Sequence, residues 1–176
     1  MNRRRLRIFL APFLVISLVG CSGSVEEQTS EGFQTAKEVF QEESVKSNEQ
    51  FKNVQLFVPG GFSIQEESDE TNIILKDNQE SYVLFINPNE QADSQLFYDL
   101  LIAEKKDVLL AEETFQHDNR FGFVAILPSK EDHYEIIASN GGYKLTTISD
   151  ENDVAKNIKR MMEVLRSVKI DEEGKE

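Results

Sequence analysis

Residues 120–150, RFGFVAILPSKEDHYEIIASNGGYKLTTISD, contain three β-like segments separated by turn-forming residues. The segments are 120–127, 133–139 and 143–148, and each is rich in apolar and β-branched side chains. Asn140-Gly141-Gly142 separates the last two, and an Asn-Gly pair favours a type I′ turn with positive φ at both central residues. His117-Asp118-Asn119 predicts a looser turn of the same kind. We therefore expect two antiparallel pairs, 108–115 with 120–127 and 133–139 with 143–148.

A helix follows this stretch. Its apolar residues recur at steps of three and four, which is typical of an amphipathic helix packed on a core; they are Val154, Ile158, Met161, Met162, Leu165 and Val168. Ser149 or Asp150 is expected to cap it. A second helix is expected within 93–106, where Leu96, Phe97, Leu100 and Leu101 predict one wide buried stripe.

Upstream, four more strands are predicted at 54–58, 62–66, 73–76 and 82–86, the last two joined as a hairpin across 77–80. Strands that are grouped in runs, and not alternating with helices, favour an α+β fold with an antiparallel sheet. We therefore predict one domain over residues 51–170, an antiparallel sheet flanked by helices. An acidic tail follows at 171–176.

The first twenty residues combine a cationic start with the apolar run 8–20. Thirteen residues are too few for a comfortable membrane span, which needs about 20, but they suit the apolar region of a secretory signal peptide. The run ends in Leu18-Val19-Gly20-Cys21, which resembles the bacterial lipobox. That resemblance implies a lipoprotein signal peptide over 1–20, cleavage before Cys21, and a diacylglyceryl lipid on the Cys21 thiol.

Residues 21–32 are small, polar and acidic, and they predict a flexible tether after the acylated cysteine. Residues 33–50 predict an amphipathic helix, because Phe33, Ala36 and Phe40 share a face with Val39 beside it, and Thr29 or Ser30 is expected to cap it. Three alternatives stay open at this stage: the helix packs on the domain, the helix belongs to the stalk, or the segment is a frayed acidic linker that only samples helix.

Charge excludes one class of function. The chain has 19 Lys+Arg against 32 Asp+Glu, a formal net charge of -13. The four arginines of the leader have no acidic neighbour there, so the remainder is more acidic still. Such a surface repels phosphate backbones, and we expect no nucleic-acid partner. The lone cysteine also excludes an internal disulfide.

The predicted domain is similar to the PsbP-like group of α/β sandwiches. The similarity lies in 57–62, where a strand runs into Pro59, Gly60, Gly61 and an aromatic residue, and in the closing hairpin and long helix that ends at Ser167-Val168. It implies a non-enzymatic binding or assembly factor.

Residues able to carry chemistry are few. His117 and His133 are the only histidines, and no nucleophile elbow, phosphate-binding glycine frame or calcium loop is present. The acidic runs at 66–70 and 171–173 suit solvated turns. We therefore predict no catalytic residue, no cofactor and no metal site, and the alternative is a hydrolase that uses two of the many carboxylates.

One basic surface stands out. Lys156, Lys159 and Arg160 are expected on the solvent face of the last helix, as a patch for an acidic partner or anionic lipid. Together these features predict a lipid-anchored protein on the extracytoplasmic face of a cell membrane, which binds an envelope protein or a small ligand. The Lys- and Glu-rich composition favours a Gram-positive cell. A role as a positional or stress-related envelope factor is the further alternative.

Overall fold

The computed structural model describes residues 24–43, 45–77, 79–130 and 132–171. Its helices are α1 (Val25–Gln41), α2 (Leu96–Lys105) and α3 (Val154–Ser167), with 3₁₀ turns η1 (Lys106–Val108) and η2 (Glu151–Asp153). Its strands are β1 (Glu49–Phe51), β2 (Val54–Leu56), β3 (Ser63–Ile64), β4 (Asn72–Lys76), β5 (Ser81–Ile86), β6 (Ala111–His117), β7 (Arg120–Pro128), β8 (His133–Asn140), β9 (Tyr143–Asp150) and β10 (Lys169–Ile170).

Within these residues a seven-stranded sheet runs in the order β3-β4-β5-β9-β8-β7-β6, and every neighbouring pair is antiparallel. The pairs β6–β7 and β8–β9 are the two predicted from the sequence, and β4–β5 is the predicted hairpin. The α+β class with an antiparallel sheet flanked by helices is confirmed.

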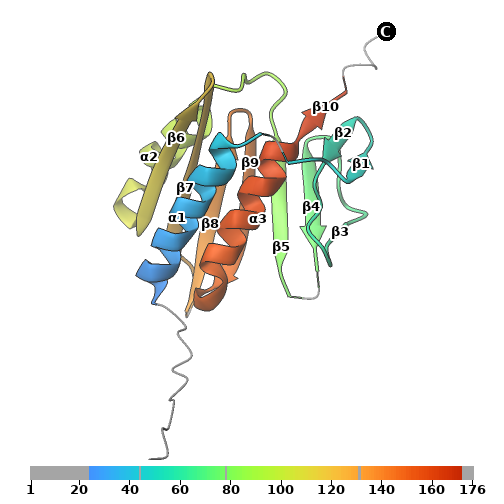
Figure 1. Ribbon diagram of the computed structural model, residues 1–176. Helices are drawn as coiled ribbons and strands as arrows, with labels where there is room; N and C mark the ends of the chain where they lie inside the picture. The colour runs from blue at the N-terminus through green and yellow to red at the C-terminus, as the bar shows by residue number, and fades with distance from the viewer. Residues whose placement is uncertain (1–23, 44, 78, 131, 172–176) are drawn as a thin grey trace, which may run out of the picture.

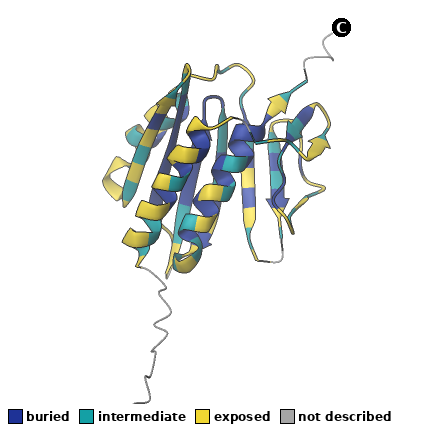
Figure 2. Ribbon diagram, in the orientation of Figure 1, coloured by how far each residue is buried: buried dark blue, intermediate teal, exposed yellow. Residues whose placement is uncertain are grey.

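Two helices cover one face of this sheet. Figure 1 shows α1 and α3 side by side across β7, β8 and β9, running in the same direction. Their buried faces and the inner face of the sheet form the main core, in which Phe40, Ile136 and Ile158 are fully buried. Figure 2 shows the buried residues of both helices turned toward the strands. Gly32 allows the close approach of α1 and α3, because a Cβ there would lie 2.5 Å from Ile158 Cδ1.

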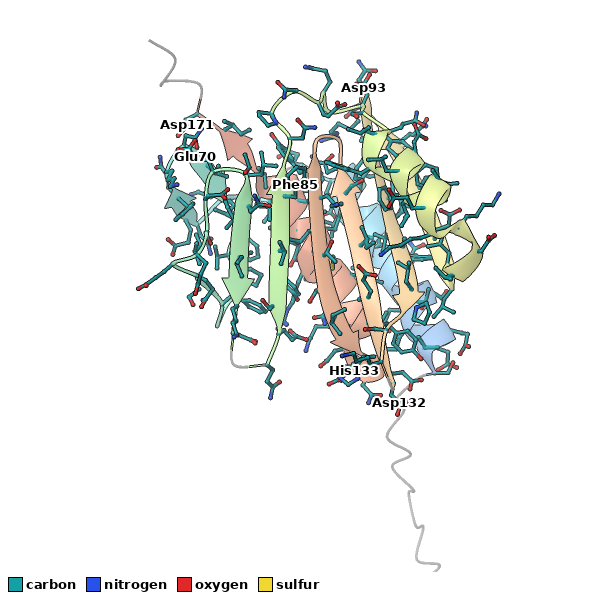
Figure 3. All side chains as sticks on the ribbon, turned by 180° about the vertical axis from the view of Figure 1, so that it is seen from behind. Glu70, Phe85, Asp93, Asp132, His133 and Asp171 are labelled. Carbon is teal, nitrogen blue, oxygen red and sulfur yellow. The ribbon has the colours of Figure 1, made fainter. Side chains whose placement is uncertain are left out.

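The opposite face is covered only in part. In Figure 3, α2 lies over the β6–β7 side, and β4, β5 and β9 face the viewer. Phe97 and Leu101 of α2 are buried against this side, but Leu100 is 48% exposed. The predicted wide stripe of α2 is therefore wrong at Leu100, because a helix at one edge of a sheet needs only a narrow contact face.

A second, three-stranded sheet goes beyond what the sequence pattern predicts. It has the order β1-β2-β10 and joins the start of the domain to its last residues. Its outer strands are only three and two residues long. Segments this short carry no readable periodicity, so β1 and β10 form because β2 is available as a template.

The two hairpin turns differ from expectation in which of them has type I′ geometry. In the β8–β9 turn Asn140 pairs with Tyr143, so Gly141 and Gly142 are central and only Gly141 has positive φ. The expected type I′ geometry is wrong there. Asp118 and Asn119 both have positive φ, at 48° and 56°, so the β6–β7 turn is the one with the type I′ signature.

The first helix begins and ends earlier than predicted, because it stops at Gln41 and residues 49–50 of the predicted helix belong to β1. α1 starts at Val25, so residues 25–32 of the expected tether are helical, and Thr29 and Ser30 lie inside the helix and do not cap it. Gly32 and Phe33 are buried with Ala36, Val39 and Phe40. α1 therefore packs on the domain, which decides between the open alternatives. The core contact stabilises a segment whose own composition is too polar to order it.

The cap of α3 also differs in detail. A 3₁₀ turn precedes the helix, Asp150 is the residue before that turn, and neither Asp150 nor Asp153 makes a capping bond with its side chain. Ser149 is buried, and its hydroxyl donates to the carbonyl of Asp150 at 2.9 Å.

The turn after β3 is organised by Asp69. Its Oδ1 accepts hydrogen bonds from the Thr71 amide (2.8 Å), the Thr71 hydroxyl (2.9 Å) and the Asn72 amide (2.7 Å). These bonds, that of the Thr71 amide first, lower the pKa of Asp69 to about 2. The folded state therefore favours the ionised carboxylate.

This lowered pKa predicts a pH dependence. The contribution of Asp69 is complete above its unfolded pKa, near 3.9, and is lost as the pH falls toward about 2. Urea unfolding between pH 4 and pH 2 should lose stability more steeply in the wild type than in Asp69→Asn. The control is Glu67→Gln, which removes an exposed carboxylate two residues away. Equal pH slopes for Asp69→Asn and the wild type would contradict the prediction.

Candidate functional site

A groove of about 710 Å³ lies between the first half of α1 and the edge strand β6. We call it the α1–β6 groove; its lining is Val25, Glu26, Thr29, Ser30, Phe33 and Gln34 of α1, Leu110 before β6, Ala111 and Glu113 of β6, Ile126 of β7 and Tyr134 of β8. Its volume falls in the range of small-ligand sites, roughly 300–1,000 Å³.

The groove forms because α1 leaves the edge of the sheet uncovered at its N-terminal end. β6 is an edge strand, and its residue Ala111 pairs with Ile126 of β7. Further along β6, the Phe115 ring packs against the Phe40 ring of α1, with the two ring centres 5.6 Å apart. This contact closes the space between helix and strand. The groove is therefore open toward the start of α1 and closed toward its end.

The helix end beside the groove is fixed in place. The Val25 amide donates to Glu151 Oε1 at 3.0 Å, and the Ala155 amide donates to Gln28 Oε1 at 3.2 Å. The turn η2, which leads into α3, thus satisfies a free amide at the start of α1, and α1 satisfies a free amide at the start of α3. Because α1 and α3 run in the same direction, their positive dipole ends lie together, and Glu151 offsets that charge.

Acidic groups line the polar side of the groove. Glu26 and Glu113 both belong to the lining. A hydrogen bond from the Ser24 side chain, followed by a bond from its own backbone amide, lowers the pKa of Glu26. Burial, followed by the charge of Glu151, raises the pKa of the Tyr134 hydroxyl. The groove is therefore negatively charged at neutral pH, and Tyr134 stays protonated.

Exposed apolar side chains mark the outer end of the groove. Leu110 is 55% exposed and lines it, and Val108, two residues earlier, is 52% exposed outside it. Neither side chain was singled out by the sequence pattern, because single exposed apolar residues are ordinary at surfaces. The signal that was available is the four-residue spacing of Val25, Thr29 and Phe33, which extends α1 backward over the expected tether.

The predicted basic patch has local partners. Lys156 Nζ lies 2.7 Å from Asp153 Oδ1, and Lys159 Nζ lies 2.6 Å from Glu163 Oε1. Both lysines are exposed on α3, as expected, but each charge is paired with a carboxylate nearby in sequence. Binding of a partner to this face stays a prediction.

Arg160 differs from the two lysines. Its Nη1 donates to Glu80 Oε2 at 2.7 Å, and its guanidinium lies 5.5 Å from the centre of the Phe62 ring. Glu80 also accepts from Asn157 Nδ2 at 2.8 Å, and Asn157 Oδ1 accepts from the Tyr82 hydroxyl at 3.0 Å. Arg160 therefore belongs to a network that holds the β4–β5 hairpin on α3, and it does not face solvent freely.

The structure does not bring the two histidines together. His117 ends β6 beside the β7 start, and His133 begins β8, so the register places them at opposite ends of the sheet. His117 Nε2 lies 3.2 Å from Asp118 Oδ2, and His133 Nε2 lies 2.8 Å from Asp150 Oδ1. Figure 3 shows His133 near Asp132, at the end of the sheet where α1 begins.

Cys21 lies outside the described residues, as do residues 1–20, most of the 171–176 tail, and 21–23 of the expected tether. Across the part of the chain that the structure describes, no group of three or more His, Cys, Asp or Glu side chains is placed to hold a metal ion. Over that same part, none of the helices has the length and apolar character needed to cross a bilayer.

A second surface lies on the sheet face that carries α2, in the part that α2 leaves uncovered. Val83 and Ile148 are 43% and 48% exposed there. Lys144 Nζ lies 5.7 Å from the centre of the Phe85 ring and 5.3 Å from the centre of the Phe97 ring. Its charge therefore covers these two aromatic rings, which lie between β5 and α2.

No family model and no curated protein matches the chain. Among solved structures, it is similar to the solution structure of cyanobacterial PsbP (CyanoP) from Synechocystis sp. PCC 6803, with 11% sequence identity and a TM-score of 0.42, over 72% of this chain and 92% of that one. The PsbP-like group is also the group that the sequence resembles. Similarity at this level transfers no function.

Proposed function

We propose that the chain is a bacterial lipoprotein, anchored through a lipid on Cys21 to the extracytoplasmic face of the cell membrane, with a non-enzymatic binding or assembly role. The lipobox-like Leu18-Val19-Gly20-Cys21 supports the anchor, and the α1–β6 groove, which opens beside Val25 four residues after Cys21, supports the binding role. Anchor and candidate binding site thus share one end of the domain. The composition favours a Gram-positive cell.

Binding is favoured over catalysis by the chemistry of the groove. A hydrolase that uses paired carboxylates needs one of them protonated, and hence a raised pKa. The pKa of Glu26 is shifted downward, opposite to that need. The other lining residues are mainly apolar or neutral. A groove of this kind suits an apolar segment of a ligand or an envelope protein.

The anchor is tested with Cys21→Ala. Cells grown with a clickable palmitate analogue should label the wild type in the membrane fraction, because two or more acyl chains give stable anchoring. The Cys21→Ala chain should carry no label and leave the membrane fraction. Lys37→Ala, an exposed change on α1, is the control for handling. A Cys21→Ala chain that still labels would refute the anchor.

A further inference from the structure

The groove begins where the chain from Cys21 reaches the domain. Val25 and Glu26 are both lining residues, and they form the first turn of α1. Only four residue steps separate Cys21 from Val25, so their Cα atoms are at most about 14 Å apart. A group attached to the Cys21 thiol therefore stays within reach of the groove in every conformation of that segment.

The apolar part of the groove suits a hydrocarbon chain. Its apolar lining includes the buried residues Phe33 and Ile126, the half-buried Ala111, and the exposed Leu110. Leu110 is 55% exposed, so a large apolar side chain faces water unless something covers it. Removing apolar surface from water drives such covering without any directional contact.

The negative charge of the α1–β6 groove limits which lipids can enter it. Glu26 and Glu113 line the groove, and the pKa of Glu26 is lowered, so it is ionised at neutral pH. These carboxylates repel a free fatty acid or an anionic phospholipid. A diacylglyceryl thioether carries no charge, and its covalent attachment replaces affinity with a high effective concentration.

We propose that the α1–β6 groove receives an acyl chain of the lipid on Cys21 when the protein is out of a bilayer. The inference rests on the proposed lipidation of Cys21. A bilayer core is more apolar than the groove and much larger, so membrane insertion withdraws the chain and leaves the groove open. The same groove is then available to an envelope partner only in the anchored state.

The test uses the lipidated protein purified from cells fed a fatty acid that carries a photoactivatable diazirine. After detergent is removed, irradiation should crosslink the acyl chain to peptides that contain residues 25–34 and 110–126. In lipid vesicles the same irradiation should transfer the crosslinks to phospholipid. A mixture with isotope-labelled protein identifies whether the crosslinked lipid and peptide belong to one molecule.

Two variants make the test specific. Leu110→Glu places a charge at the outer end of the groove and should lower the crosslink yield about tenfold, because an ionised carboxylate is costly against a hydrocarbon chain. Val108→Glu makes the same change at a matched exposed residue outside the groove and should leave the yield unchanged. Both positions are exposed, so thermal unfolding should confirm that each variant is folded.

The outcomes separate the two proposals. A Cys21 that carries no diazirine lipid refutes the anchor and, with it, this inference. A labelled Cys21 whose crosslinks lie outside the groove, join different molecules, or respond equally to Leu110→Glu and Val108→Glu leaves the anchor in place and overturns the inference alone.

Discussion

Replacing Asn157 with leucine should lower the free energy of unfolding by about 3–5 kcal/mol, measured by urea denaturation. Asn157 is fully buried in α3. Its Oδ1 accepts from the Tyr82 hydroxyl at 3.0 Å, and its Nδ2 donates to Glu80 Oε1 at 2.8 Å and to Ser149 Oγ at 3.0 Å. Leucine leaves the buried Tyr82 and Ser149 hydroxyls and the half-buried Glu80 carboxylate without this partner, and each unsatisfied buried group costs about 1–3 kcal/mol.

The control for Asn157→Leu is Asn152→Leu, the same substitution at an exposed residue of η2, which should change stability by no more than about 0.5 kcal/mol. Tyr82→Phe removes the hydroxyl that Asn157 Oδ1 accepts from. The double variant should lose less free energy of unfolding than the sum of the losses of the two single variants, by about 0.5–3 kcal/mol. An Asn157→Leu loss under about 1 kcal/mol, or strict additivity, would show that the network does not hold α3 to the hairpin.

Neighbouring segments of the fold were predictable from local patterns. The hairpins β4–β5, β6–β7 and β8–β9 each combine apolar strands with a turn whose residues tolerate unusual φ, and α3 carries a strict three- and four-residue apolar repeat. These signals act between residues close in sequence. They survive in the fold because the sheet buries the same side chains that the pattern marks.

Contacts between distant segments were not predictable in this way. β10 pairs with β2 across more than a hundred residues, and α1 is ordered at residues 25–32 only because it packs on α3. Arg160 has the helical position of a solvent residue, but the β4–β5 turn brings Glu80 to it. The α1–β6 groove depends on the same long-range packing, which explains why no sequence motif marks it.

The largest effect at a turn is expected from Gly141→Ala. Gly141 has φ of +55°, and a Cβ there would lie 2.6 Å from Gln91 O and 2.7 Å from Ala92 Cα. The loop 87–95 crosses the β8–β9 turn, and the Asn87 amide donates to Gly142 O at 2.9 Å. Alanine combines left-handed strain with displacement of a backbone segment, so the free energy of unfolding should fall by about 3–4 kcal/mol.

Two other glycines separate these causes. Gly61 has φ of +89°, and a Cβ added there would have nothing within 4 Å, so Gly61→Ala should cost only the strain, about 1–2 kcal/mol. Gly60 has neither positive φ nor a close neighbour, so Gly60→Ala should stay within about 0.5 kcal/mol of wild type. Urea denaturation of the three variants should therefore rank Gly141→Ala as most destabilised, then Gly61→Ala, then Gly60→Ala. If Gly141→Ala cost no more than Gly61→Ala, the loop 87–95 would have to move freely off the turn, and close packing at that end of the sheet would be wrong.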